Sequence, residues 1–214
     1  QQGGGHTTPK DDKYPSPRIF VVASPRPKTG CTFTAVNLAV MSASYGLRTL
    51  LIDGDLRNPT IAEYFQSGMS LMQDRIAELL RYLSDRPVEL ESDNELVQEL
   101  QTLLIRSGQG YENLSVFRGE YGFSEFTSNT NLMTFNKLRQ NIDAINELMH
   151  FDLVIVDSSP LLTSNDTVNM TAHLNGEILL LVESGSTKRE DAQKAVEHLA
   201  RRNIPIQGAI LNRV

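Results

Sequence analysis

The chain has 214 residues, of which 40% are hydrophobic and 21% charged, and it carries a formal net charge of -6. This composition predicts one soluble globular domain, and the negative charge argues against a surface that binds nucleic acid by neutralising phosphates. The single cysteine, Cys31, cannot form an internal disulfide. We find no secretory signal pattern and no apolar run of transmembrane length, so we expect a cytoplasmic protein without a membrane span of its own.

Residues 1–17 combine Gly, Pro and polar residues without periodicity, which predicts a flexible tail or linker. Residues 18–214 are expected to form one domain. Within it, residues 66–113 read as a helical and acidic insertion on the rim, because a helical run is followed by the acidic stretch "SDRPVELESDNELVQELQ".

Short apolar runs rich in β-branched residues alternate with helical patterns along the rest of the chain. The predicted strands are 18–24, 48–53, 114–117, 151–157, 177–183 and 206–211. The predicted helices are 34–45, 132–149 and 188–202. This alternation predicts an α/β fold, in which a doubly wound, mostly parallel sheet is flanked by helices and binds ligands at the carboxyl ends of its strands.

The segment "PRPKTGC" joins the first predicted strand to the first predicted helix. Backbone N–H groups at such a junction can cradle a phosphate. Gly30 and Thr32 fit the pattern G-x-x-x-x-G-K-[ST], whereas Cys31 occupies the lysine position and Lys28 a preceding glycine position. The segment therefore has the outline of a phosphate-binding loop without its usual charge.

Three aspartates follow two other predicted strands. Asp53 and Asp55 lie in "LLIDGDLRNP", and Asp157 ends the strand of "FDLVIVDSSP". Carboxylates at neighbouring strand ends converge on the crevice above the first loop, which suits a Mg²⁺ held partly through water beside a nucleotide.

The order of "SPRPKTGCTFTAVNLA", "LLIDGDLRNP", "FDLVIVDSSPLL" and the C-terminal "GSTKREDAQKAVEHLARRNIPIQGAILNRV" resembles the cytoplasmic domain of bacterial tyrosine autokinases (BY-kinases) of exopolysaccharide and capsule systems. These kinases belong to the MinD/ParA branch of P-loop ATPases. The resemblance covers nearly all of residues 18–214 except the 66–113 segment.

The resemblance implies ATP or ADP with Mg²⁺ as cofactors. It implies a metal site at Thr32, Asp53 and Asp157, with Asp53 and Asp55 as the catalytic carboxylates, one orienting a metal-bound water and the other accepting a proton. Asn212 matches the position that contacts adenine. The nucleotide-binding residues that it implies are Lys28, Thr29, Gly30, Cys31, Thr32, Phe33, Arg57 and Asn212.

The loop departs from the family pattern in its charge. The family lysine faces the β and γ phosphates, and a charge-assisted contact of this kind contributes about 1.5–3 kcal/mol. Cys31 cannot supply it, and we expect the helix N-terminus to lower the pKa of its thiol toward a thiolate that repels phosphate. Lys28 stands where positive φ is most easily adopted by glycine. We therefore predict impaired ATP binding or hydrolysis.

Three function classes follow. The leading one is a regulatory, catalytically impaired member of the family, peripheral at the inner face of the membrane through a polysaccharide co-polymerase or a chain-length or export protein. The alternative is an active ATP-dependent tyrosine kinase or ATPase whose loop uses Lys28 or Arg26 as the missing charge. A MinD/ParA-type positioning ATPase ranks last, because neither a membrane-binding C-terminal helix nor a basic DNA-binding face is evident. Self-association into a homo-oligomer stays open.

Overall fold

The computed structural model describes residues 15–55, 58–65, 75–76, 78–79, 94–107, 110–118 and 132–213. Arg57 and nearly all of the predicted N-terminal tail lie outside these residues, as does most of 66–93, so the expectations for them stay predictions.

Six parallel strands form one sheet in the order β3-β2-β4-β1-β5-β6. Every residue of the central strands β2 and β4 is buried, which explains their unbroken apolar sequences. The predicted doubly wound α/β fold is confirmed. The strands are β1 Arg18–Ala23, β2 Thr49–Asp53, β3 Leu114–Arg118, β4 Leu153–Asp157, β5 Glu177–Glu183 and β6 Ile206–Asn212.

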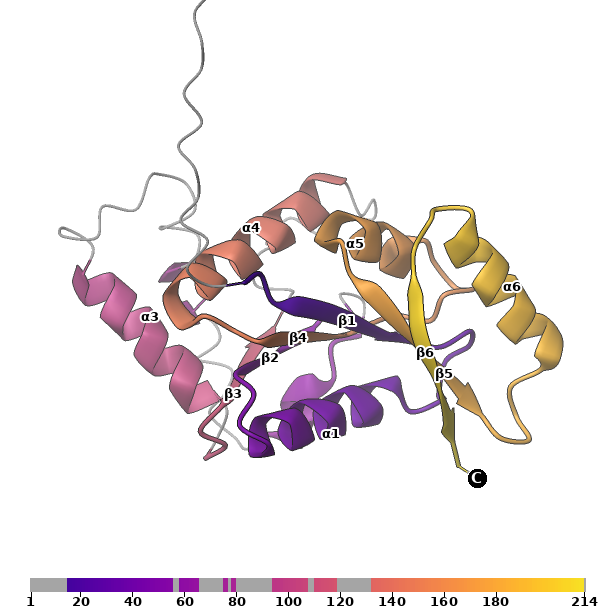
Figure 1. Ribbon diagram of the computed structural model, residues 1–214, viewed down its shortest axis with the longest axis horizontal. Helices are drawn as coiled ribbons and strands as arrows, with labels where there is room; N and C mark the ends of the chain where they lie inside the picture. Colours follow the sequence, from indigo (N-terminus) through magenta and orange to yellow (C-terminus); the bar gives the residue numbers. More distant parts are fainter. Residues whose placement is uncertain are drawn as a thin grey trace, which may run out of the picture.

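Helices cover both faces of this sheet (Figure 1). Helix α1 and the short 3₁₀ helix η1 pack on one face, and the remaining described helices pack on the other. The bounds are α1 Cys31–Ser44, η1 Ile61–Tyr64, α3 Asn94–Ser107, α4 Leu132–Met149, α5 Asp166–Leu174 and α6 Arg189–Ala200.

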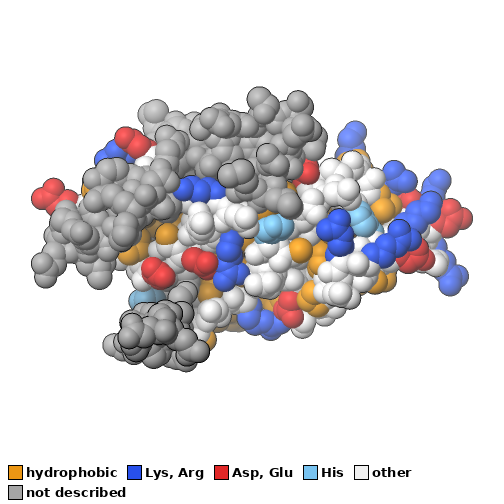
Figure 2. All heavy atoms as spheres, turned by 90° about the horizontal axis from the view of Figure 1, so that it is seen from above, with side chains coloured by type: hydrophobic (Ala, Val, Ile, Leu, Met, Phe, Trp, Pro, Cys, Tyr) orange, Lys and Arg blue, Asp and Glu red, His pale blue; other side chains and the backbone are white. Residues whose placement is uncertain are grey.

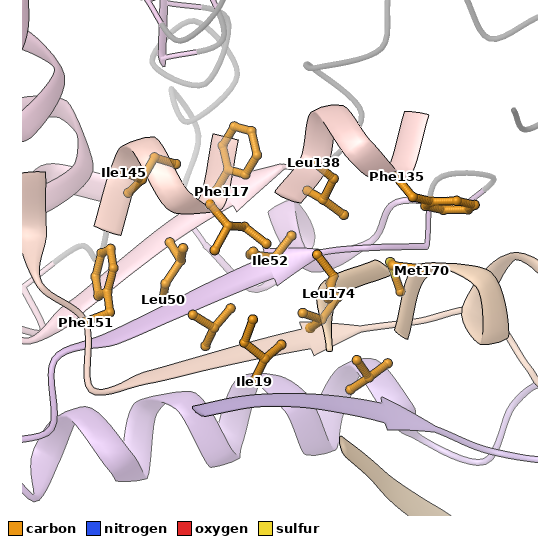
Figure 3. Packing of buried hydrophobic residues seen from close by; sticks show 14 of the residues in the cluster. Ile19, Leu50, Ile52, Phe117, Phe135, Leu138, Ile145, Phe151, Met170 and Leu174 are labelled. Atoms are coloured by element: carbon orange, nitrogen blue, oxygen red, sulfur yellow. The ribbon is translucent and has the colours of Figure 1, made fainter. Parts of the chain in front are cut away.

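Each face of the sheet has its own apolar core. The larger cluster packs alternate residues of the strands, such as Leu50 and Ile52, against α4 and α5 side chains that include Leu138 and Leu174 (Figure 3). The smaller cluster packs Leu51 and Ile155 against α1. Because successive strand residues point to opposite faces, one sequence run supplies both cores.

Two helices differ from the sequence expectations. Helix α3 begins inside the run that we read as a rim insertion, yet it buries Val97, Leu100 and Leu104 in the larger core and packs beside β3. Helix α5 was not predicted, because its nine residues are too few to show a clear apolar period. Among the described residues, no helix is long and apolar enough to cross a membrane.

Candidate functional site

The loop between β1 and α1 lies at the carboxyl end of the sheet, as the sequence predicts. It borders an open pocket of about 580 Å³. Lys28, Thr29, Gly30, Cys31, Thr32 and Phe33 line this pocket together with Asp55, while Asn58, Thr60 and Tyr64 close its far side.

The loop has a tightly specified backbone. Lys28 has φ 67 and Gly30 has φ 96, so both residues adopt left-handed conformations. The carbonyl of Arg26 accepts hydrogen bonds from the hydroxyls of Ser24 and Thr29, each at 2.7 Å. A lysine is therefore unfavourable in the left-handed conformation at position 28, where the family pattern has a glycine.

Strand β6 contacts the loop through Asn212. The Asn212 amide donates to the carbonyl of Thr29 at 2.9 Å, and a Cβ on Gly30 would lie 2.9 Å from the same nitrogen. Only glycine therefore fits at position 30 without displacing Asn212. In this structure Asn212 positions the loop, and its expected contact with adenine stays a prediction.

The expectation for Cys31 was wrong. The pKa of its thiol is raised to about 12, mainly by burial and to a smaller extent by the nearby Asp157 and Asp55, while a hydrogen bond with Ser24 partly offsets the rise. Cys31 is the first residue of α1 and packs at the edge of the smaller core. Desolvation is the largest influence on this thiol, so the side chain is neutral.

The Arg26 side chain belongs to the same loop but does not line the pocket. Its guanidinium pairs with Asp191 in the first turn of α6, at 3.2 Å for Nε and 3.0 Å for Nη2. This two-point contact holds the pKa of Asp191 below its usual range. Arg26 is thus committed to an ion pair that ties the loop to α6.

Two of the predicted carboxylates lie side by side beneath the loop. Asp53 and Asp157 are register partners on β2 and β4, and each is 1% exposed. The pKa of Asp157 is raised to about 7, mainly by burial and also by the charges of Asp53 and Asp55, while hydrogen bonds with Thr32 and Ser158 partly offset the rise. Within the described part of the chain, Asp157 Oδ2 has no hydrogen-bond partner. A buried carboxyl group with an unpartnered oxygen fits a bound cation.

The other polar groups order these carboxylates. Asp53 Oδ2 accepts a hydrogen bond from the Ile61 N–H at 2.9 Å, and Asp55 Oδ1 accepts one from Ser159 Oγ at 2.7 Å. Thr32 and Thr60 share a hydroxyl contact at 3.2 Å. Sequence reasoning missed Thr60 and Ser159; Ser159 follows Asp157 closely and could have been found, whereas nothing in the sequence points to Thr60.

The predicted site residues therefore gather at one edge of the sheet, except Arg57, which lies outside the described residues. Phe33 lines the pocket but is 56% exposed. No group of three or more His, Cys, Asp or Glu side chains in the described ranges is arranged as a metal cage.

The chain is similar to several known proteins. No protein-family model matches the chain. The tyrosine-protein kinase CpsD of Streptococcus pneumoniae is 26% identical over 92% of this chain and 76% of its own length. The tyrosine-protein kinase YwqD of Bacillus subtilis is 28% identical over 91% of this chain and 72% of its own length. The chain spans only 22% of another relative, the putative tyrosine-protein kinase EpsB of Ralstonia nicotianae, at 26% identity.

Solved structures share the fold. The kinase domain of Escherichia coli tyrosine kinase ETK superposes with a TM-score of 0.64 at 24% identity, covering 92% of this chain and 67% of that one. The BceF tyrosine kinase domain gives a TM-score of 0.61 at 25% identity, covering 91% of this chain and 68% of that one. MinD of Aquifex aeolicus gives 0.55 at 17% identity, covering 92% and 70%.

The strand order, the loop at the carboxyl end of β1 and these neighbours define a P-loop ATPase fold of the MinD/ParA class. Within that class, the chain is a relative of the bacterial tyrosine-protein kinases.

Proposed function

We propose that this chain is a BY-kinase-like P-loop domain of an exopolysaccharide or capsule system, a regulatory member that binds a nucleotide with Mg²⁺ but is impaired in hydrolysis. Neutral Cys31 is the observation that carries this proposal. It stands at the first residue of α1, where the family pattern requires a permanent cation. Phosphoryl transfer depends mostly on positioning and charge stabilisation, so the loss affects chemistry more than fold.

Nucleotide binding is supported by the groups that remain. The pocket retains the left-handed Gly30, the Thr32 hydroxyl and a helix N-terminus. Asp157 and Asp53 would hold Mg²⁺ together with Thr32, and the metal would neutralise phosphate charge. Asp55 also lines the pocket, where it would orient a water or an incoming hydroxyl.

The partner in this proposal is a membrane polysaccharide co-polymerase or a chain-length or export protein. Its support is the similarity to tyrosine-protein kinases such as CpsD and EpsB. Through that partner the domain would act at the inner face of the membrane. An active kinase or ATPase stays the alternative, and a positioning ATPase ranks below it because the similarity to plasmid partition proteins is 16% identity.

Calorimetry with ADP and ATP tests the proposal. Binding should strengthen when Mg²⁺ is added, and Asp157→Ala should remove at least about 1 kcal/mol of that gain, the usual contribution of a charged contact. The exposed Asp152, which pairs with Arg48 far from the pocket, provides a control as Asp152→Ala. Binding that ignores both Mg²⁺ and Asp157→Ala would exclude this crevice as the nucleotide site.

Measuring ATP turnover distinguishes the catalytically impaired regulatory domain from an active kinase or ATPase. A regulatory domain should show turnover indistinguishable from a blank that contains Asp157→Ala. Sustained turnover that Asp157→Ala abolishes would establish the active enzyme instead.

A further inference from the structure

We propose that Lys28, at the tip of the loop between β1 and α1, is the cation that contacts the phosphates of a bound nucleoside di- or triphosphate, in place of a charge at position 31. This inference rests on the proposed nucleotide site and names the residue that gives the site its remaining affinity for phosphate.

The first observation is the conformation of Lys28. Its φ of 67 is left-handed, a region that costs a side-chain-bearing residue stability and that glycine adopts freely. Such conformations persist where surrounding structure imposes them, and they concentrate at functional sites. A lysine at this position therefore bears a cost that glycine would avoid.

The second observation is that the loop is held in place around Lys28 from both sides. On one side, the Arg26 carbonyl accepts the Ser24 and Thr29 hydroxyls, and the Arg26 guanidinium is anchored on Asp191. On the other side, the Asn212 amide holds the Thr29 carbonyl. Because these contacts fix the backbone, the Lys28 side chain starts from a fixed point beside the pocket.

The third observation is that the other nearby cation is engaged. The Arg26 guanidinium forms an ion pair with Asp191. Lys28 forms no ion pair with any carboxylate in the described ranges. Lys28 is exposed and lines the same pocket as Gly30 and Thr32. A long, flexible ammonium side chain at the rim can turn inward over an anion that binds at the helix N-terminus.

The ligand class follows from the charges in the site. Asp55 lines the pocket and Asp157 lies beneath it with an unpartnered oxygen, so a bare anion would meet carboxylates. A phosphate chain carrying Mg²⁺ presents its metal to these carboxylates and its outer oxygens to the rim. Among the described residues that line the pocket, Lys28 is the cation that matches the outer oxygens in charge.

The experiment compares the affinity for Mg-ADP, Mg-ATP and adenosine in wild type, Lys28→Met and Lys28→Gly by calorimetry. We expect both variants to bind the two nucleotides about tenfold more weakly, as for a lost charge-assisted contact, with adenosine binding unchanged. Lys188→Met is the matched control, because Lys188 is an exposed lysine at the N-cap of α6 and does not line the pocket. Its nucleotide affinity should stay within about twofold of wild type, since distant surface charges are screened.

A second-site variant distinguishes charge from shape. Adding Cys31→Lys to Lys28→Met returns a cation to the helix start and should restore the lost affinity. The Tm of Lys28→Gly should equal or exceed that of wild type, so weaker binding is not explained by unfolding.

Equal nucleotide affinity in wild type and Lys28→Met would overturn the assignment of Lys28 while leaving the nucleotide site intact. Absence of Mg-nucleotide binding by wild type, with Cys31→Lys also failing to bind, would overturn the proposed nucleotide site and Lys28 with it. A loss of equal size in Lys188→Met would show that overall charge acts rather than a contact from Lys28.

Discussion

At the scale of single residues, the main feature of the site is that two ionisable side chains, Cys31 and Asp157, are largely buried from water. Burial raises the pKa of the Cys31 thiol to about 12 and that of the Asp157 carboxyl to about 7, so the thiol stays neutral and the carboxyl ionises only near neutral pH. Desolvation disfavours the charged form of an acid, and the neighbouring Asp55 adds repulsion. Ionising the buried Asp157 carboxyl is thus unfavourable, and a bound cation would offset this cost.

Asp157→Asn should therefore stabilise the metal-free protein, and more so at high pH. The unfolded chain ionises Asp157 near its ordinary pKa of 3.8 while the folded chain keeps the proton until about 7, so the wild type loses stability as pH rises across this window. Three pKa units correspond to about 4 kcal/mol, and we expect a gain of about 2–4 kcal/mol at pH 8 and much less at pH 4.5. Urea unfolding at the two pH values measures this.

Asp152→Asn is the control, because we expect it to destabilise the protein at pH 8 rather than stabilise it. Its hydrogen-bonded pair with Arg48 holds the pKa of Asp152 below its ordinary value, so its contribution is present at pH 8 and lost as pH falls through the folded pKa. If Asp157→Asn were less stable than the wild type at pH 8, the burial of an unfavourable charge at Asp157 would be contradicted.

At the scale of elements, the loop and strand β6 form one unit. The Asn212 amide reaches across from the end of β6 to the Thr29 carbonyl, over a sequence separation of 183 residues. Beside it, Arg213 pairs with Glu183 at 2.6 Å and joins the ends of β5 and β6. The end of β6 therefore helps to hold the backbone of the phosphate loop in place.

Gly30→Ala should test this contact. The variant carries both a positive φ and a Cβ that would lie 2.9 Å from Asn212 Nδ2, so we expect a loss of about 2–3 kcal/mol in the free energy of unfolding. In an Asn212→Ala background the close contact is absent, and the same substitution should cost about 1–2 kcal/mol.

Gly46→Ala is the control for backbone strain alone. Gly46 has φ 86, and a Cβ there would have no neighbour within 4 Å, so its cost should match that of Gly30→Ala in the Asn212→Ala background. Equal losses from Gly30→Ala with and without Asn212 would show that the two residues do not interact.

At the scale of the whole molecule, charge is unevenly distributed. Lys and Arg side chains gather at the end of the molecule that carries α6, as the face seen in Figure 2 shows. The chain as a whole has a net charge of -6, and residues 85–99 contain six acidic residues and one arginine. Exposed charges of this kind favour oriented association with a partner of opposite charge.

Binding to an envelope-polysaccharide partner should weaken when salt rises from about 0.05 to 0.5 M, because screening removes steering between exposed charges. We expect that replacing Glu89, Glu91 and Asp93 by their amides reproduces most of this loss. The comparison variant neutralises Lys188, Arg189 and Lys194 on α6 instead. Pull-down and titration with the source cell's polysaccharide co-polymerase measure both, and a partner that never copurifies would count against the regulatory proposal.

The sequence by itself determined the sheet and the edge at which the candidate site residues lie. All six strands were predicted within two residues of their ends, because a buried parallel strand needs an unbroken apolar run. The helix 132–149 was predicted with its observed ends, since its long apolar stripe gives a clear period. Asp53, Asp55 and Asp157 were placed at the right edge because strand direction fixes where a terminal residue lies.

Only the tertiary structure decided how the site residues are used. The pKa of Cys31 depends on burial against the smaller core and on aspartates from two other strands, none of which is local in sequence. The pairing of Arg26 with Asp191 spans 165 residues, and the contact of Asn212 with the loop spans 183. Local sequence encodes backbone conformation and burial pattern, whereas the charge state and partner of a side chain depend on what the folded chain brings beside it.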